Sequence, residues 1–132
     1  MFEISVTTEF AAAHAIILAD QREPLHGHNW HVTVTVSGPR LDSEGLLCDF
    51  HRVETSLCEL VSRFHNRNLN DLPPFNTSLN PSAEHVALHI ADELSRALNG
   101  RLPRGVHISS VRVTEAPGCA ATYRPPQAPN PP

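Results

Sequence analysis

Hydrophobic and polar residues alternate along the first ten residues of the chain, with one parity made up of Phe2, Ile4, Val6, Thr8 and Phe10. This period of two is typical of a strand with one buried face. The alternation returns over residues 30–36, and strand-forming residues fill 106–115 and 119–124, which Pro117-Gly118 separates. The sequence therefore predicts four strands, the first of which leads directly to His14.

Two segments between the second and third predicted strands carry apolar residues at spacings of three and four, the period of an amphipathic helix. The first spans residues 50–64. The second runs from Ala83 to Leu98, with Ser82 suited to cap its start and Asn99-Gly100 suited to end it. Residues 15–25 and 65–79 show no sustained period, so we expect loops there. The second loop is long for a compact domain, which indicates a functional loop.

The order of two strands, two helices and two strands predicts an α+β fold, with a four-stranded antiparallel sheet and both helices on one face. A chain of 132 residues is one domain by size, which we assign to residues 1–124. Residues 125–132 contain five prolines and little to bury, so they predict a disordered tail. The open edges of such a sheet favour pairing with other copies of the chain.

Composition narrows the choice of partner. A net charge of −4 excludes the basic surface expected of a nucleic-acid-binding protein, and no stretch is long and apolar enough to span a membrane. We therefore expect a small-molecule partner. The chain begins directly with a strand pattern, and its three cysteines form no C-x-x-C pair. These features predict free thiols and a cytoplasmic location.

The strongest chemical signal is the segment Leu25-His26-Gly27-His28, with His14 eleven residues before it. Alternate side chains of an extended segment share a face, so His26 and His28 can direct their imidazoles at one point. With His14 from a neighbouring strand, three imidazoles leave one position of tetrahedral zinc open, as in catalytic zinc sites. The alternative is that these histidines pack on their strands and bond to the backbone.

The same residues also carry a resemblance to a known family. Phe10-x-Ala12-Ala13-His14 and Leu25-His26-Gly27-His28-Asn29 resemble the zinc signature of the 6-pyruvoyl-tetrahydropterin synthase family, which includes the 6-carboxy-tetrahydropterin synthases. Further matches follow in the family's order over about residues 2–124: Gly45-x-x-x-Asp49-Phe50, Asn68-Leu69-Asn70, Asn80-Pro81-Ser82-Ala83-Glu84, Val113-x-Glu115 and Tyr123-Arg124. The resemblance implies the tunnelling fold, in which the sheets of three subunits join into a barrel and two trimers stack into a homohexamer.

The resemblance also implies a Zn²⁺ cofactor bound by His14, His26 and His28, and a 7,8-dihydroneopterin triphosphate substrate. Glu84 and Glu115 are the expected pterin ligands, because one carboxylate can accept from both the amino group and the ring N–H of a pterin. Glu115 lies on the same face of its predicted strand as Val111 and Val113. A carboxylate on such an apolar face is costly unless a ligand or partner satisfies it. The alternatives are a solvent-exposed edge charge for Glu115 and a favourable charge at a helix start for Glu84.

The catalytic base is where the sequence departs from its relatives. Members that make the pyruvoyl or carboxy product usually carry a cysteine four residues before His-Gly-His, a position that Arg22 occupies here. Glu23 instead resembles the variant that cleaves the same substrate to 6-hydroxymethyl-7,8-dihydropterin for folate synthesis, and a desolvated carboxylate can act as a general base. The alternative is a solvated loop glutamate.

The second departure lies in the long loop. Relatives carry Asp-His before Asn-Leu, whereas this chain has His65-Asn66 before Arg67-Asn68. Asparagine cannot transfer a proton, so either His65 takes over that function or this part of the proton relay is lost. Asp71 is a weaker substitute.

Several functions stay open at this stage. The first is a zinc-dependent lyase that uses Glu23 and His65, and a related one is a 6-carboxy-tetrahydropterin synthase of 7-deazapurine or queuosine synthesis. A pterin-binding protein without turnover is an alternative from another class. A purely structural metal protein is disfavoured because three ligands leave zinc open, and chemistry like that of GTP cyclohydrolase is more distant. Three arginines are candidates for binding the triphosphate: Arg22, Arg63 and Arg67.

Overall fold

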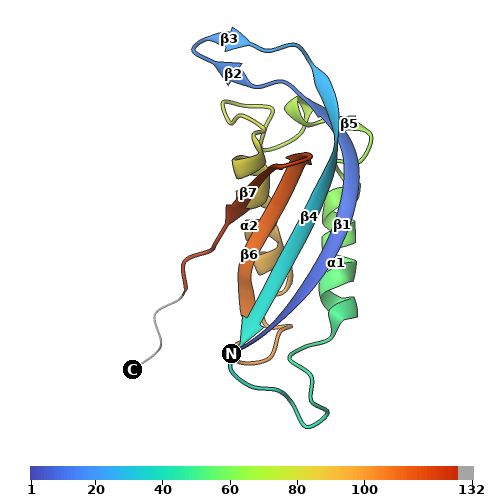
Figure 1. Cartoon of the computed structure of the whole chain (residues 1–132), viewed down its shortest axis with the longest axis vertical. Coiled ribbons are helices and arrows are strands. Elements are labelled where there is room, and N and C mark those ends of the chain that lie inside the picture. The colour runs from blue at the N-terminus through green and yellow to red at the C-terminus, as the bar shows by residue number, and fades with distance from the viewer. Residues whose placement is uncertain (128–132) are drawn as a thin grey trace.

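Two long antiparallel strands form the centre of the structure, a computed structural model that describes residues 1–127 (Figure 1). Strand β1 spans Phe2–His14 and β4 spans His26–Gly38, and they pair along their whole length. Strand β6 (His107–Ala116) pairs with β4, and β7 (Cys119–Tyr123) pairs with β6, both antiparallel. These are the four strands that the alternation predicted.

The sheet has one strand more than predicted. Strand β5 (Arg67–Asn68) pairs in parallel with Ala12 and Ala13 of β1, so the sheet is mixed and five-stranded, in the order β5-β1-β4-β6-β7. The 3₁₀ helix η1 (Leu69–Asp71) follows at once. The expected loop at 15–25 also contains a small hairpin of β2 (Ile17–Leu18) and β3 (Gln21–Arg22). Two-residue strands are too short to produce a detectable period, which is why the sequence pattern missed them.

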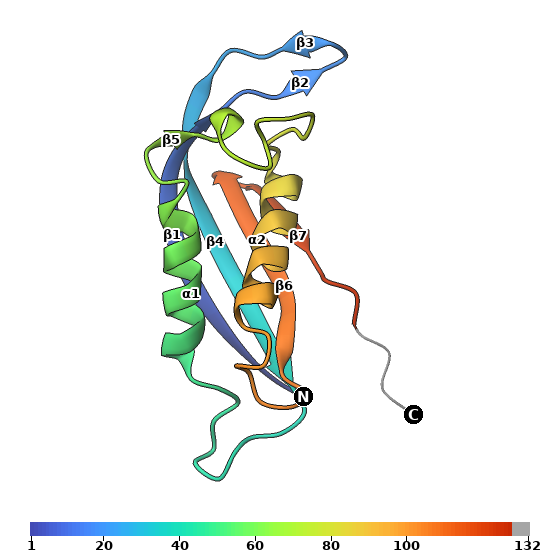
Figure 2. The same cartoon turned by 180° about the vertical axis from the view of Figure 1, so that it is seen from behind.

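Both helices lie on the same face of the sheet, as predicted (Figure 2). Helix α1 spans Phe50–Ser62 and packs on β1, whereas α2 spans Ala83–Ala97 and packs on β6 and β7. Asp49 caps the first helix by accepting from the N–H of His51, and Ser82 caps the second by accepting from the N–H of His85. Both caps satisfy amide groups that have no partner within the helix.

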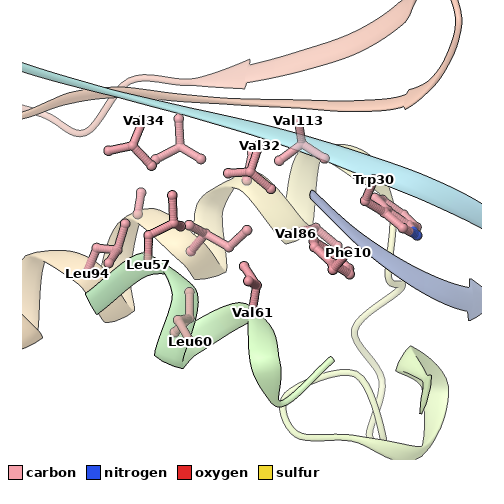
Figure 3. Packing of buried hydrophobic residues seen from close by; sticks show 14 of the residues in the cluster. Phe10, Trp30, Val32, Val34, Leu57, Leu60, Val61, Val86, Leu94 and Val113 are labelled. Atoms are coloured by element: carbon pink, nitrogen blue, oxygen red, sulfur yellow. The ribbon is translucent and has the colours of Figure 1, made fainter. Parts of the chain in front are cut away.

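The core fills the space between this face and the helices (Figure 3). Phe10 is opposite Trp30 in the β1–β4 pair, and their rings stack, with centroids 5.8 Å apart and planes 3° from parallel. The Trp30 indole N–H donates to the Ala12 carbonyl oxygen at 3.0 Å. Because side chains alternate along a strand, the residues beyond these two on the same face are Ala12, His14, His26 and His28.

Other sequence predictions concern the ends and surface of the chain. No helix among residues 1–127 is long and apolar enough to cross a membrane. The three cysteines, all within the described residues, are free thiols. Of the predicted tail, residues 125–127 have no regular structure and residues 128–132 lie outside the described part of the chain.

Candidate functional site

Three histidines meet at the end of the β1–β4 pair that lies farthest from the N-terminus. In the register of the two strands His14 is opposite His26, and His28 is opposite Ala12. All three side chains therefore point to the face that carries the core. Their ring centroids lie 4.7 Å apart for His14 and His26, 5.0 Å for His14 and His28, and 4.7 Å for His26 and His28. The strand register alone thus brings three imidazoles to one point.

Backbone carbonyls fix the orientation of two of these rings. The His14 Nδ1 lies 2.7 Å from the Pro81 carbonyl oxygen, and the His26 Nδ1 lies 2.8 Å from that of Pro24. A carbonyl oxygen can only accept, so each Nδ1 carries the hydrogen and donates it. In the neutral ring the Nε2 is then left with a free lone pair. This is the usual arrangement in metal-binding histidines, where a second group orients the ligand.

The carboxylate of Glu115 lies against the lone pair of His14 and against the ring of His28. Its Oε1 is 3.1 Å from the Nε2 of His28 and 3.4 Å from the Nε2 of His14. Both nitrogens are buried and make no hydrogen bond within the described residues. A carboxylate oxygen and a neutral imidazole lone pair are both acceptors, so they repel each other unless a positive charge lies between or beside them. The arrangement therefore fits a bound cation.

Ligand atoms from His14, His26, His28 and Glu115 all lie within 4.8 Å of one another. Nitrogen and carboxylate donors at this spacing suit a small tetrahedral cation such as Zn²⁺. Burial lowers the pKa of His28 below its usual 6.5, and the charge of Glu115 offsets part of that effect. A lowered pKa keeps the imidazole neutral near pH 7, which is the form that binds a metal. The donor set thus fits a zinc site.

The sequence analysis missed two neighbours of the histidines. The Pro81 carbonyl is a backbone group, which no residue type reveals, although Asn80-Pro81 belongs to one of the family motifs. Trp30 packs edge-on against His14 and His28, with ring centroids 4.9 and 5.7 Å away. Its position two residues after His28 on an alternating strand is the signal that would have found it.

Glu23 lies at the rim of this histidine cluster. Its Oε1 is 3.9 Å from the Nε2 of His26 and accepts a hydrogen bond from the N–H of Ile16 at 2.9 Å. The side chain is 31% exposed, so it is neither free in solvent nor buried. The structure therefore brings the predicted base close to the predicted metal ligands.

Three other predicted site residues, His65, Asp71 and Glu84, are not part of the histidine cluster of their own chain. The His65 Nδ1 accepts from the N–H of Ala11 at 3.1 Å, on the outer edge of β1. Asp71 is exposed at the end of η1, and Glu84 is exposed in the first turn of α2. Their predicted roles therefore depend on how a substrate or a second subunit approaches this end of the sheet.

The three arginines proposed for phosphate binding are in different surroundings. Arg22 is exposed on β3, and Arg63 lies 3.9 Å from Glu93 of α2 in an ion pair between the two helices. Arg67 lines a hollow of about 600 Å³ together with small residues of β1 and β4 and with His28. A second hollow, of about 390 Å³, is lined by His28 and Glu115 between β4 and β6. Of the three, Arg67 is the one that shares a hollow with a histidine of the cluster.

Comparison with known proteins identifies the family. A family model described as 6-pyruvoyl tetrahydropterin synthase matches residues 3–126, so the chain belongs to this family. The chain is 30% identical over 112 residues to an Archaeoglobus fulgidus protein provisionally named 6-carboxy-5,6,7,8-tetrahydropterin synthase, covering 85% of this chain and 86% of that one. It is 32% identical over 91 residues to the dihydroneopterin monophosphate aldolase of Pyrococcus furiosus, covering 69% of this chain and 73% of that one.

Solved structures agree on the fold. The 6-pyruvoyl tetrahydropterin synthase of Caenorhabditis elegans matches with a TM-score of 0.80 at 20% identity, covering 95% of this chain and 96% of that one. The Plasmodium vivax 6-pyruvoyltetrahydropterin synthase, solved as a variant in which a catalytic glutamate is replaced by alanine, matches with a TM-score of 0.73 at 20% identity, covering 92% and 96%. At this identity the likeness establishes the subunit fold that the resemblance implied, a sheet with two helices on one face.

Proposed function

We propose that the chain is a zinc-dependent lyase that cleaves a carbon–carbon bond in the side chain of 7,8-dihydroneopterin triphosphate, giving 6-hydroxymethyl-7,8-dihydropterin. The observation that carries this proposal is the carboxylate of Glu23, 3.9 Å from His26, beside a cluster of ligand atoms that includes no thiol. The names of two similar proteins support it. The Pyrococcus furiosus relative is named an aldolase, and the Plasmodium vivax protein has a catalytic glutamate.

In this proposal His14, His26 and His28 hold the zinc, which would act as a Lewis acid and polarise an oxygen of the substrate side chain. Glu115 accepts hydrogen bonds from the amino group and ring N–H of the pterin, which fixes the ring beside the histidines. The hollow of about 390 Å³ lined by His28 and Glu115 supports this position for the ring. Glu84 is the second proposed pterin ligand.

The proposed reaction is a retro-aldol cleavage. The carboxylate of Glu23 accepts the proton of the hydroxyl on the second side-chain carbon. The bond between the first and second side-chain carbons then breaks, and the second carbon becomes an aldehyde that keeps the phosphate ester. The electron pair passes to the first carbon and into the adjacent ring imine, after which a proton adds to that carbon. A general base within hydrogen-bonding reach of the proton that it removes typically raises the rate of such a step about 10²- to 10⁴-fold.

Two further elements complete the proposal. His65 and Asp71 are the candidates for returning a proton, and both lie outside the cluster of a single chain. Sheets with open edges, such as the one that ends in β7, favour the assembly of several chains around such a site. We propose a homohexamer made of two trimers, in which a neighbouring subunit can bring its own His65 towards the cluster.

A second candidate has one observation in its favour. The Archaeoglobus fulgidus relative, which covers more of this chain than the aldolase does, is provisionally named a 6-carboxy-tetrahydropterin synthase. That reaction would leave a carboxylate on the pterin, so the product separates the two candidates.

The test is to incubate the zinc-loaded protein with the triphosphate and monophosphate of 7,8-dihydroneopterin and to separate the oxidised pterins by chromatography. We expect 6-hydroxymethylpterin, reduced at least about a hundredfold in Glu23→Gln. Cys119→Ser is the matched control, because it removes the thiol at the start of β7 and should leave the rate unchanged. A carboxy or pyruvoyl product would refute the assignment of Glu23, and pterin binding without any product would favour a binding protein.

A further inference from the structure

The segment 15–17 joins β1 to the β2–β3 hairpin, and side chains bind its backbone on both edges. Asn70 makes two hydrogen bonds to Ala15: its Oδ1 accepts from the N–H at 2.8 Å and its Nδ2 donates to the carbonyl oxygen at 2.8 Å. Asn80 does the same to Ile17, at 2.9 Å for both bonds. Two asparagine amides thus pair with alternate residues of one extended segment.

The residue between them faces the opposite edge and binds the proposed base. The N–H of Ile16 donates to Glu23 Oε1 at 2.9 Å, and the N–H of Glu23 donates to the Ile16 carbonyl oxygen at 3.0 Å. Backbone groups of successive residues in an extended chain point to opposite edges. The segment is therefore fixed by Asn70 and Asn80 on one edge, and it fixes Glu23 on the other.

Few other contacts stabilise the β2–β3 hairpin. Its strands are two residues each, and isolated hairpins of that size are marginally stable at best. Ile17 and Leu18 are 50% and 63% exposed, so they add little packing. The turn between the strands places Ala19 and Asp20 at positive φ, 47° and 64°, a region that residues other than glycine seldom adopt. The two asparagine amides are therefore the main restraint on the segment that positions Glu23.

We infer that Asn70 and Asn80 are positioning residues for the carboxylate of Glu23, an inference that rests on the proposed function. Their amides hold segment 15–17, and the N–H of Ile16 then fixes one carboxylate oxygen of Glu23, Oε1, beside His26. The other oxygen, Oε2, is left to accept the substrate proton. Asn70 and Asn80 belong to the two asparagine-containing motifs whose role the sequence left unassigned.

The kinetic test is a double-mutant cycle. Asn70→Ala and Asn80→Ala are each made in the wild-type protein and in Glu23→Gln, with Asn99→Ala, in the turn that follows α2, as the matched control. In the wild-type background we expect kcat to fall by about ten- to a hundredfold, the usual effect of a small misplacement. KM and metal content should stay unchanged. In the Glu23→Gln background the same substitutions should have no further effect, because the group they position is absent.

A second measurement does not depend on turnover. Amide hydrogen exchange at Ile16, followed by NMR, should become faster in Asn70→Ala and Asn80→Ala and stay unchanged in Asn99→Ala. Equal losses of kcat in both backgrounds, loss of metal, or unchanged exchange at Ile16 would each overturn the inference. If the wild-type protein cleaves no pterin while exchange at Ile16 responds as expected, the proposed function fails, but the restraint on Glu23 stands.

Discussion

Replacing Glu115 by glutamine separates two roles that its carboxylate can have, metal ligand and pterin acceptor. Its Oε1 lies 3.1 Å from His28 and 3.4 Å from His14, so it can be a fourth metal ligand. It also lines a hollow beside His28, so it can accept from a pterin. The substitution removes the charge and leaves one acceptor and one donor in nearly the same shape, so the fold should survive.

The expected magnitude follows from the hydrogen bonds that change. A hydrogen bond to a charged group contributes roughly 1.5–3 kcal/mol, and in Glu115→Gln one of the two pterin donors meets an N–H instead of an oxygen. Because Glu115 is 25% exposed, water offsets part of the loss. We expect pterin binding to weaken by about 2–3 kcal/mol, which is about 30- to 150-fold in Kd.

Calorimetry with sepiapterin or biopterin measures the affinity, and elemental analysis of the same samples measures the metal. We expect Glu115→Gln to keep about one zinc per chain, because three imidazoles remain, whereas His28→Ala, the positive control, should lose most of it. Unchanged pterin affinity in a folded variant would refute the pterin role. Loss of zinc in Glu115→Gln would make Glu115 a metal ligand instead.

Two further predictions concern stability and assembly. Burial between Phe64 and Phe75 lowers the pKa of His89 below 6.5, so from that pH downwards the unfolded chain binds more protons and the folded state loses stability. Melting curves at about pH 7.5 and about pH 5 should therefore differ less for His89→Gln than for the wild-type protein, and an equal difference would contradict this. Light scattering should give a mass about six times the 14.5 kDa of one chain, and a monomer would refute the proposed hexamer.

Most of the architecture follows from local patterns. The alternation from Phe2 to Phe10 predicted β1, and His14 lies on the same strand face as Phe10. One sequence pattern therefore predicted both the strand and the direction of a proposed metal ligand. The helix that Ser82 caps begins and ends within one residue of its predicted bounds. Such elements are long enough for hydrophobic periodicity to outweigh local exceptions.

The parts that were missed depend on contacts between distant residues. Strand β5 and the β2–β3 hairpin are two-residue pairings, and the hairpin depends on amides that lie 55 and 63 residues away, in Asn70 and Asn80. The approach of Glu115 to His28 depends on the register between β4 and β6, in which His31 pairs with Thr114, and no local sequence pattern fixes that register. The sequence thus predicted the proposed site residues but not the contacts that orient them.

The proposal depends most directly on which bond of the substrate breaks, and phosphorus NMR of the complete reaction reports it. Retro-aldol cleavage leaves the phosphate ester intact on a two-carbon aldehyde, in equal amount to the 6-hydroxymethyl-7,8-dihydropterin formed. A pyruvoyl product keeps all three side-chain carbons and carries no phosphate, so its formation must release inorganic polyphosphate. We expect the signal of an esterified two-carbon phosphate that rises with the pterin product and is reduced at least about a hundredfold with Glu23→Gln. Free inorganic polyphosphate accompanied by a pterin with a three-carbon side chain would contradict the proposal.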